Sequence, residues 1–204
     1  MATPASQATD ATTSAAPAIA DPAPLGLAGF AMTTFVLSLV NANILAANLG
    51  AVVLPLALFY GGLAQLLAGM WEFKNKNTFG AVAFTSYGAF WLAYDAYVKF
   101  VAGGLPAATA YQATGVFLLA WTIFTLYMLL ASLGTNRAVF LVFLVLVVTF
   151  VLLTIGAFAQ SATITKIGGY LGIITALAAW YTSAAVVTNA TWKRTVLPVG
   201  PFNR

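Results

Sequence analysis

Residues 22–71 read PAPLGLAGFAMTTFVLSLVNANILAANLGAVVLPLALFYGGLAQLLAGMW, a run of 50 residues without a charged side chain. A helix needs about 20 apolar residues to cross a bilayer, so this run is too long for a single span. Its middle part, residues 41–50, contains three Asn and one Gly, which are frequent in turns. The run therefore predicts two membrane-spanning helices, near 25–45 and 52–72.

The composition of the whole chain agrees with a membrane protein. Of its 204 residues, 62% are hydrophobic and only 6% are charged, and the mean hydropathy is +0.96. Soluble domains carry about 25% charged residues, so a soluble globular enzyme is excluded. The chain has no Cys and no His, which excludes disulfide scaffolds, thiolate or imidazole metal sites and His-dependent nucleophilic catalysis. We therefore expect no metal and no cofactor, and the net charge of +4 rests on too few charges to suggest nucleic-acid binding.

Four further apolar segments follow the first two. We expect helices near 77–94, 110–132, 138–159 and 167–190. The predicted fold is all-α, a polytopic membrane protein whose six transmembrane helices occupy residues 21–192. The connections are too short to hold an extramembrane domain.

Lys and Arg residues are distributed unequally between the two sides of these helices. One side holds Lys74, Lys76, Arg137, Lys193, Arg194 and Arg204. The other side holds Lys99 and Lys166, the latter in the last connection. Because cytoplasmic loops are enriched in Lys and Arg, both termini of this multi-pass plasma-membrane protein are expected in the cytoplasm. Residues 1–20, rich in Ala, Thr, Ser and Pro, are expected to form a disordered cytosolic tail, and residues 193–204 a short one.

Polar side chains inside a span are expected to face the bundle interior or a water-filled path. On the first helix, Phe30, Thr34 and Asn41 recur at helical spacing on one face. For Thr34, a hydrogen bond to its own backbone is an equally good explanation. Gln65 shares a glycine-rich face of the second helix, which favours close packing. Tyr87 lies near the middle of the third helix, where a buried hydroxyl needs a partner.

Several motifs occur in a fixed order along the chain. They are DPAPLGL at 21–27, MTT at 32–34, FYGGLAQ at 59–65, NTFG at 77–80, FTSYGAFW at 84–91 and TVLP at 195–198. This set, which extends over most of the chain, resembles the acetate uptake transporter family, the succinate–acetate permease group of bacteria, archaea and fungi. The family signature usually begins with Asn, where this chain has Asp21.

The resemblance implies a six-helix protomer, a homohexamer, and a path through each protomer for acetate and other small carboxylates, succinate and lactate among them. In relatives the path narrows at a Phe, a Leu and a Tyr, which correspond here to Phe30, Leu146 and Tyr87. Leu146 is placed by counting forward from Arg137 and back from Gly156. Family members are described both as proton-coupled permeases and as channels, so protons are an expected partner and the choice stays open.

Ten further residues are expected to bind the substrate or line its path: Pro24, Leu25, Gly26, Thr33, Thr34, Asn41, Gln65, Thr85, Ser86 and Trp121. With no Lys or Arg inside the expected spans, a carboxylate would meet only neutral donors, including the phenol of Tyr87. An apolar neck of this kind can gate by dewetting.

Two carboxylates lie near the ends of the expected spans. Glu72 is followed by Lys74 and Lys76, and Asp95 lies four residues before Lys99. We expect each to form an ion pair and to stay ionised beside positive charge. Neither is then a proton carrier, and a proton would cross with the substrate as undissociated acid. Protonation coupled to transport remains an alternative for Asp95.

Two other classes of function stay open. A channel for neutral small molecules such as urea or amides would give a flux independent of the ionisation of the solute. A membrane enzyme or an assembly subunit is the third class. We expect no enzymatic activity, because the spans hold no His, no Cys and no pair of carboxylates.

Overall fold

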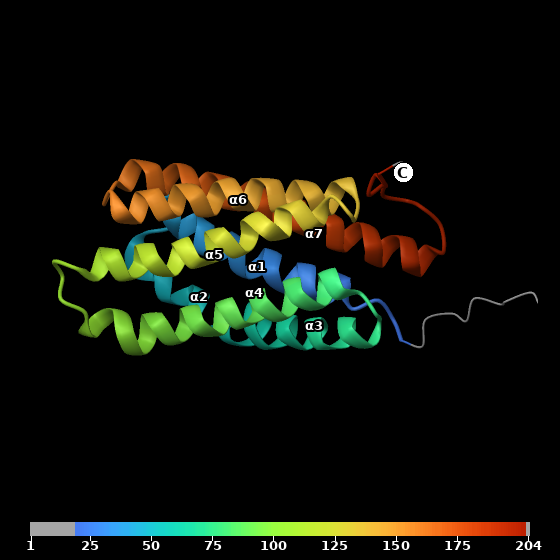
Figure 1. Ribbon diagram of the computed structural model, residues 1–204, viewed down its shortest axis with the longest axis horizontal. Coiled ribbons are helices and arrows are strands. Elements are labelled where there is room, and N and C mark those ends of the chain that lie inside the picture. Colours follow the sequence, from blue (N-terminus) through green and yellow to red (C-terminus); the bar gives the residue numbers. More distant parts are fainter. Residues whose placement is uncertain (1–18, 203–204) are drawn as a thin grey trace, which may run out of the picture.

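The computed structural model describes residues 19–202, which form a bundle of helices (Figure 1). The elements are α1 (Ala23–Asn41), η1 (Ala47–Val52), α2 (Val53–Leu58), η2 (Phe59–Ala64), α3 (Gln65–Lys74), α4 (Thr78–Ala96), η3 (Tyr97–Val101), η4 (Ala102–Gly104), α5 (Ala110–Ser132), α6 (Arg137–Phe158) and α7 (Ala162–Trp192). Within these residues the only β-type pairing is an isolated bridge between Asn136 and Pro201. The all-α prediction is confirmed for the described part of the chain.

Five helices of the described chain are long and apolar enough to cross a membrane. They are α1, the continuous stretch Ala47–Lys74, α5, α6 and α7. The expected span that is not among these five is the third one, near 77–94, which corresponds to α4 (Thr78–Ala96). This helix has 19 residues but carries Asp95 and several aromatic and hydroxyl side chains. A polytopic helical membrane protein is therefore confirmed in outline.

The last helix begins earlier than the sequence suggested. The Ser161 hydroxyl oxygen accepts a hydrogen bond from the backbone N–H of Ile164 at 3.4 Å, and α7 starts at Ala162. Ser is a favoured residue at this capping position, because its oxygen satisfies a free N–H of the first turn. Lys166 consequently lies inside α7, and the prediction that it lies between the last two helices is wrong.

The second span is continuous but changes its winding. Pro55 lies in the first turn of α2, where its missing N–H costs little. The six residues of η2, Phe59–Ala64, then form a π-helical turn that contains Gly61 and Gly62. A Cβ on Gly61 would collide with the Thr33 side chain, so this glycine allows η2 to approach α1 closely. Such wide turns occur often near functional sites.

The helices pack as neighbours in a simple order. The main contacts join α1 to α7, α7 to α6, α6 to α5, and α3 to α4. In Figure 1, α6 and α7 run along one side of the bundle, α3 and α4 along the other, and α1 lies between them. The helices α1, α4 and α6 thus bring their middles to the interior.

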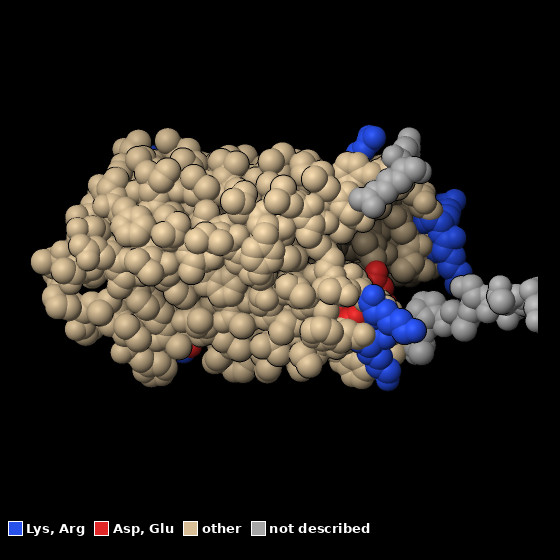
Figure 2. Space-filling model, in the orientation of Figure 1, with Lys and Arg blue, Asp and Glu red and all other residues tan. Residues whose placement is uncertain are grey.

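Both ends of the described chain lie at the same end of the bundle (Figure 1). Figure 2 shows that most Lys and Arg side chains gather at this end. The cations at the helix ends and in the connections there, within residues 19–202, are Lys74, Lys76, Arg137, Lys193 and Arg194. We call it the basic end.

The C-terminal segment after α7 folds back onto the basic end. The carbonyl oxygens of Gly200 and Val199 accept hydrogen bonds from the N–H groups of Arg137 and Ala138 at 2.8 and 3.0 Å. These bonds satisfy two of the free N–H groups at the start of α6. The expected N-terminal tail, residues 1–20, lies outside the described residues except for its last two.

Candidate substrate path

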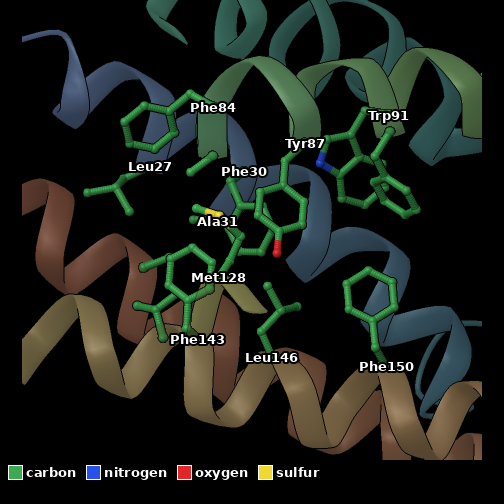
Figure 3. Close-up of a cluster of buried hydrophobic side chains, with 14 of the residues drawn as sticks. Leu27, Phe30, Ala31, Phe84, Tyr87, Trp91, Met128, Phe143, Leu146 and Phe150 are labelled. Carbon is green, nitrogen blue, oxygen red and sulfur yellow. The ribbon is translucent and has the colours of Figure 1, made fainter. Parts of the chain in front are cut away.

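Three side chains from three helices meet in the interior of the bundle. Phe30 comes from α1, Tyr87 from α4 and Leu146 from α6, and each is at most 5% exposed. The ring centroids of Phe30 and Tyr87 lie 5.5 Å apart. Figure 3 shows Leu146 facing the two rings. The three residues that the resemblance implied as a constriction therefore lie together, and we call them the neck.

Two cavities meet at the neck. The first has a volume of about 280 Å³ and opens away from the basic end, among the ends of α1, α4 and α6 and the starts of α5 and α7. The second, of about 250 Å³, opens at the basic end between α1, α4 and α6. Phe30 and Leu146 border both cavities, whereas Tyr87 borders the second. The neck thus divides one line of cavities that runs along the bundle axis. We call the first the distal cavity and the second the basic-end cavity.

Three of the ten further candidates border these cavities. Thr34 and Asn41 border the distal cavity, and Gln65 borders the basic-end cavity. Thr34 and Asn41 follow Phe30 along α1, as their helical spacing predicted. Both cavities therefore offer a few polar groups within largely apolar walls, which is typical of small-molecule sites. These groups are neutral except for Asp21, which borders the basic-end cavity.

The other seven candidates lie outside both cavities. The carbonyl of Pro24 accepts a hydrogen bond from the Ser183 hydroxyl at 2.7 Å, and Leu25 is 45% exposed on the outside. Of the remaining five, Gly26, Thr33 and Thr85 pack between helices, Trp121 packs near the ring of Tyr87, and Ser86 is half-buried. The motifs that contain them position the helices, as the following contacts show.

Close helix packing accounts for most of these positions. A Cβ on Gly26 would lie 2.5 Å from the Phe84 ring. The Thr33 hydroxyl donates a hydrogen bond to the carbonyl of Gly29 at 2.9 Å. This is the kind of backbone hydrogen bond that we predicted as an alternative for Thr34. The Thr85 side chain lies directly against Gly69. These residues set the spacing of α1, α3 and α4 around the path.

The Tyr87 hydroxyl has a different role from the one expected. It donates to Thr125 Oγ1 at 2.9 Å, and Thr125 in turn donates to the carbonyl of Trp121 at 2.7 Å. The single phenol proton is therefore engaged on α5 rather than free for a substrate. The hydrogen bond fixes the ring of Tyr87 in the neck.

Two residues that border the distal cavity each carry a buried donor without a partner among the described residues. Thr34 Oγ1 and Trp91 Nε1 are buried, and neither forms a hydrogen bond to another described residue. Both residues border this cavity. A buried donor without a partner is costly, so these two atoms are the natural contacts for a bound acceptor such as a carboxylate oxygen. Thr34 is thus distinguished from Thr33 by a free hydroxyl.

Sequence reasoning missed several residues that border the path. Ser38 and Thr149 border the distal cavity, and Phe143 borders the basic-end cavity. Ser38 lies one helical turn after Thr34, so the spacing on α1 could have revealed it. Thr149 and Phe143 each lie three residues from Leu146, but nothing within the uniformly apolar α6 marks them out.

The two carboxylates at the ends of the spans differ sharply. Asp95 Oδ1 lies 2.9 Å from Lys99 Nζ, which confirms the expected ion pair. Glu72 is completely buried, and its carboxylate forms no ion pair within residues 19–202; the neutral amide side chains of Asn75 and Asn77 lie beside it. The prediction of an ion pair for Glu72 is wrong. The reason is that α3 ends at Lys74, whose Nζ lies 5.3 Å from the centre of the Trp71 ring, while Glu72 faces α4.

Comparison with known proteins adds independent information. The "Succinate-acetate/proton symporter SatP" of Escherichia coli strain K12 is 44% identical over 182 residues, which cover 89% of this chain and 96% of that protein. "Acetate permease A" of Emericella nidulans is 41% identical over 200 residues, covering 90% of this chain and 66% of that protein. The solved "Structure of the bacterial acetate channel SatP" matches with a TM-score of 0.84 at 44% identity, over 89% of this chain and 99% of that one.

A profile of one family covers almost the whole sequence. The GPR1/FUN34/yaaH family profile matches residues 5–204. This match, together with the relatives above, confirms the resemblance drawn from the ordered motifs between residues 21 and 198. The chain therefore belongs to the GPR1/FUN34/yaaH family.

Proposed function

We propose that this protein transports acetate and other small carboxylates, succinate among them, across the plasma membrane. The observation that carries the proposal is the pair of cavities that meet at Phe30 and Leu146. The relatives named for acetate and succinate transport support the choice of substrate. A line of cavities along the bundle axis fits the passage of a solute better than an enzymatic site, and we propose no enzymatic activity.

The chemistry of the path favours weak and transient binding. Neither cavity is bordered by a Lys or Arg among the described residues. A carboxylate in the distal cavity would meet the hydroxyl of Thr34 and the indole N–H of Trp91. At the neck the walls are apolar, so a solute sheds water there before it passes. Weak binding of the carboxylate in the cavities on either side of the neck, where it is briefly dehydrated, favours its rapid passage.

We further propose six spans in each protomer and a homohexamer in the bilayer. The helix α4 packs along α3, contributes Tyr87 to the neck and joins the two ends of the bundle. These positions support its role as the sixth span, although it is less apolar than the others. The hexamer rests on the family resemblance.

Both termini are proposed to lie in the cytoplasm, because the basic end carries most of the cations. The chain has no Cys, so a single introduced cysteine is the only residue of the chain with a thiol that a maleimide can label. In intact cells an impermeant maleimide should label Gly103→Cys, at the opposite end, where no atom lies within 4 Å of an added Cβ. It should label Ala5→Cys only after permeabilisation. The reverse pattern would invert the proposed topology.

Flux into liposomes tests the proposed function directly. Purified protein should exchange labelled external acetate for internal unlabelled acetate faster than protein-free liposomes do. Acetamide, which has the same size and no charge, should cross at the protein-free rate. Equal stimulation of acetamide flux and acetate flux would favour the channel for neutral solutes. Stimulation of neither flux would rule out the proposed transport function.

A further inference from the structure

The carboxylate of Glu72 lies buried between α3 and α4, close to the basic-end cavity. The side chain is 0% exposed. Its Oε1 lies against Gly80, where an added Cβ would be only 2.7 Å away. Gly80 and Asn77 both border the basic-end cavity. The carboxylate is thus separated from the cavity only by the thickness of these two residues.

Glu72 belongs to a row of polar groups along the α3–α4 contact. Gln65 and Glu72 lie seven residues apart on the same face of α3, and Thr85 faces them from α4 across Gly69. The oxygens Gln65 Oε1 and Thr85 Oγ1 lack hydrogen-bond partners among the described residues, and the carboxylate of Glu72 has neutral amides beside it but no cation paired with it. Gln65 borders the basic-end cavity beside the neck. Unpartnered buried oxygens and an unpaired carboxylate in one row point to a functional cause, because native proteins leave few such groups.

The charged groups around Glu72 do not neutralise it. The amide side chains of Asn75 and Asn77 can donate hydrogen bonds to it, and the carboxylate of Asp21, which precedes α1, repels its negative charge. Lys74 packs over Trp71, and no ion pair joins Lys76 to Glu72. The helix α1 carries no charged residue, and Asp95 lies at the other end of α4. A buried carboxylate without a counter-ion is costly when ionised.

We propose that Glu72 is a proton-binding site that couples proton uptake to the entry of a carboxylate from the basic end. The proposal rests on the proposed transport function. An ionised Glu72 would repel an anion in the adjacent cavity, whereas a proton bound at one carboxylate oxygen removes this repulsion. Proton and anion therefore favour each other, and by linkage the effect is reciprocal. The proton is taken from water in the cavity and returned to water when the anion leaves.

Two kinds of flux in liposomes separate this proposal from free passage of undissociated acid. The first is exchange of labelled for unlabelled acetate at equal pH, which needs no net movement of protons. The second is net accumulation of acetate driven by a pH gradient, corrected for protein-free liposomes. In Glu72→Gln we expect exchange to remain measurable, while the accumulation ratio falls to that of protein-free liposomes. Glu72→Asp should restore part of the gradient response.

Asp95→Asn is the matched control, because Asp95 is the other buried carboxylate of the described spans but is paired with Lys99. It should keep the wild-type accumulation ratio. A wild-type ratio in Glu72→Gln would overturn the inference and leave acetate transport standing. Accumulation driven by a sodium gradient in place of the pH gradient would also overturn it. Absence of acetate exchange in the wild-type protein would instead contradict the proposed transport function itself.

Infrared spectra of the wild-type protein provide a readout that does not depend on a folded variant. Acid-minus-alkaline difference spectra should show the carbonyl band of a protonated carboxyl group. The band should be lost in Glu72→Gln and retained in Asp95→Asn. If the wild-type protein shows no titrating carboxyl band, or if the band survives in Glu72→Gln, Glu72 does not bind the proton.

Discussion

Replacing Phe30 or Leu146 by alanine should raise the flux of succinate and lactate relative to acetate by about tenfold or more. Both side chains border both cavities, so each forms part of the wall through which a solute must pass. Alanine removes most of the apolar bulk and lets water and larger solutes enter. Acetate already fits, and its own flux should change less. The measurement is exchange of each labelled acid in liposomes at one pH.

Phe35→Ala is a suitable control for this experiment. Phe35 lies on the same helix as Phe30, but its ring packs on Trp180 at 5.2 Å and borders neither cavity. The same loss of a ring at this position should leave the ranking of substrates unchanged. An unchanged ranking in well-folded Phe30→Ala and Leu146→Ala would show that the narrow point lies elsewhere. A change in Phe35→Ala as large as theirs would point to general loosening of the bundle.

The positions of the helices could be predicted from the sequence because each span is a local property. Apolar runs of sufficient length and the turn residues between them locate five of the helices within a few residues. The start of α7 was missed because a polar capping residue, Ser161, begins the helix before the apolar run does. Lys166 was read as a boundary, although a lysine in the second turn reaches the end of the bundle.

The neck was only partly visible in the sequence. Phe30 and Tyr87 lie on faces that carry other polar groups, and their helical spacing therefore indicated an inward position. Leu146 lies in a helix that is apolar on all sides, so only the family resemblance placed it. Which side of α6 faces α1 and α4 is decided by tertiary packing, and no local pattern encodes that choice.

The environment of Glu72 shows a second limit of local reasoning. Its neighbours Lys74 and Lys76 suggested an ion pair only because they lie close to it in the sequence, just after the expected end of the helix near residue 72. The helix ends at Lys74, and Lys76 adopts a left-handed backbone conformation with φ 58°. The two lysines therefore leave the face that carries Glu72. Closeness in the sequence therefore does not decide which charges pair at a helix end, because the backbone after the helix directs each side chain.

Thr34→Val should weaken the apparent affinity for acetate by about tenfold or more, because a hydrogen bond to a charged group contributes about 1.5–3 kcal/mol. Valine has nearly the shape of threonine and removes only the hydroxyl. Trp91→Phe removes the second free donor of the distal cavity, and the double variant should bind more weakly than either single one. The concentration dependence of acetate exchange in liposomes provides the measurement.

Thr33→Val separates this effect from a general disturbance of α1. The Thr33 hydroxyl is bonded to the carbonyl of Gly29 and borders neither cavity, so its loss should leave the apparent affinity for acetate unchanged. The two adjacent threonines thus differ in one respect, which is whether the hydroxyl already has a partner. If the double variant Thr34→Val/Trp91→Phe binds acetate as the wild-type protein does, the distal cavity does not hold the carboxylate. In that case the neutral donors for the substrate must be sought on the basic-end side of the neck, where Gln65 lies.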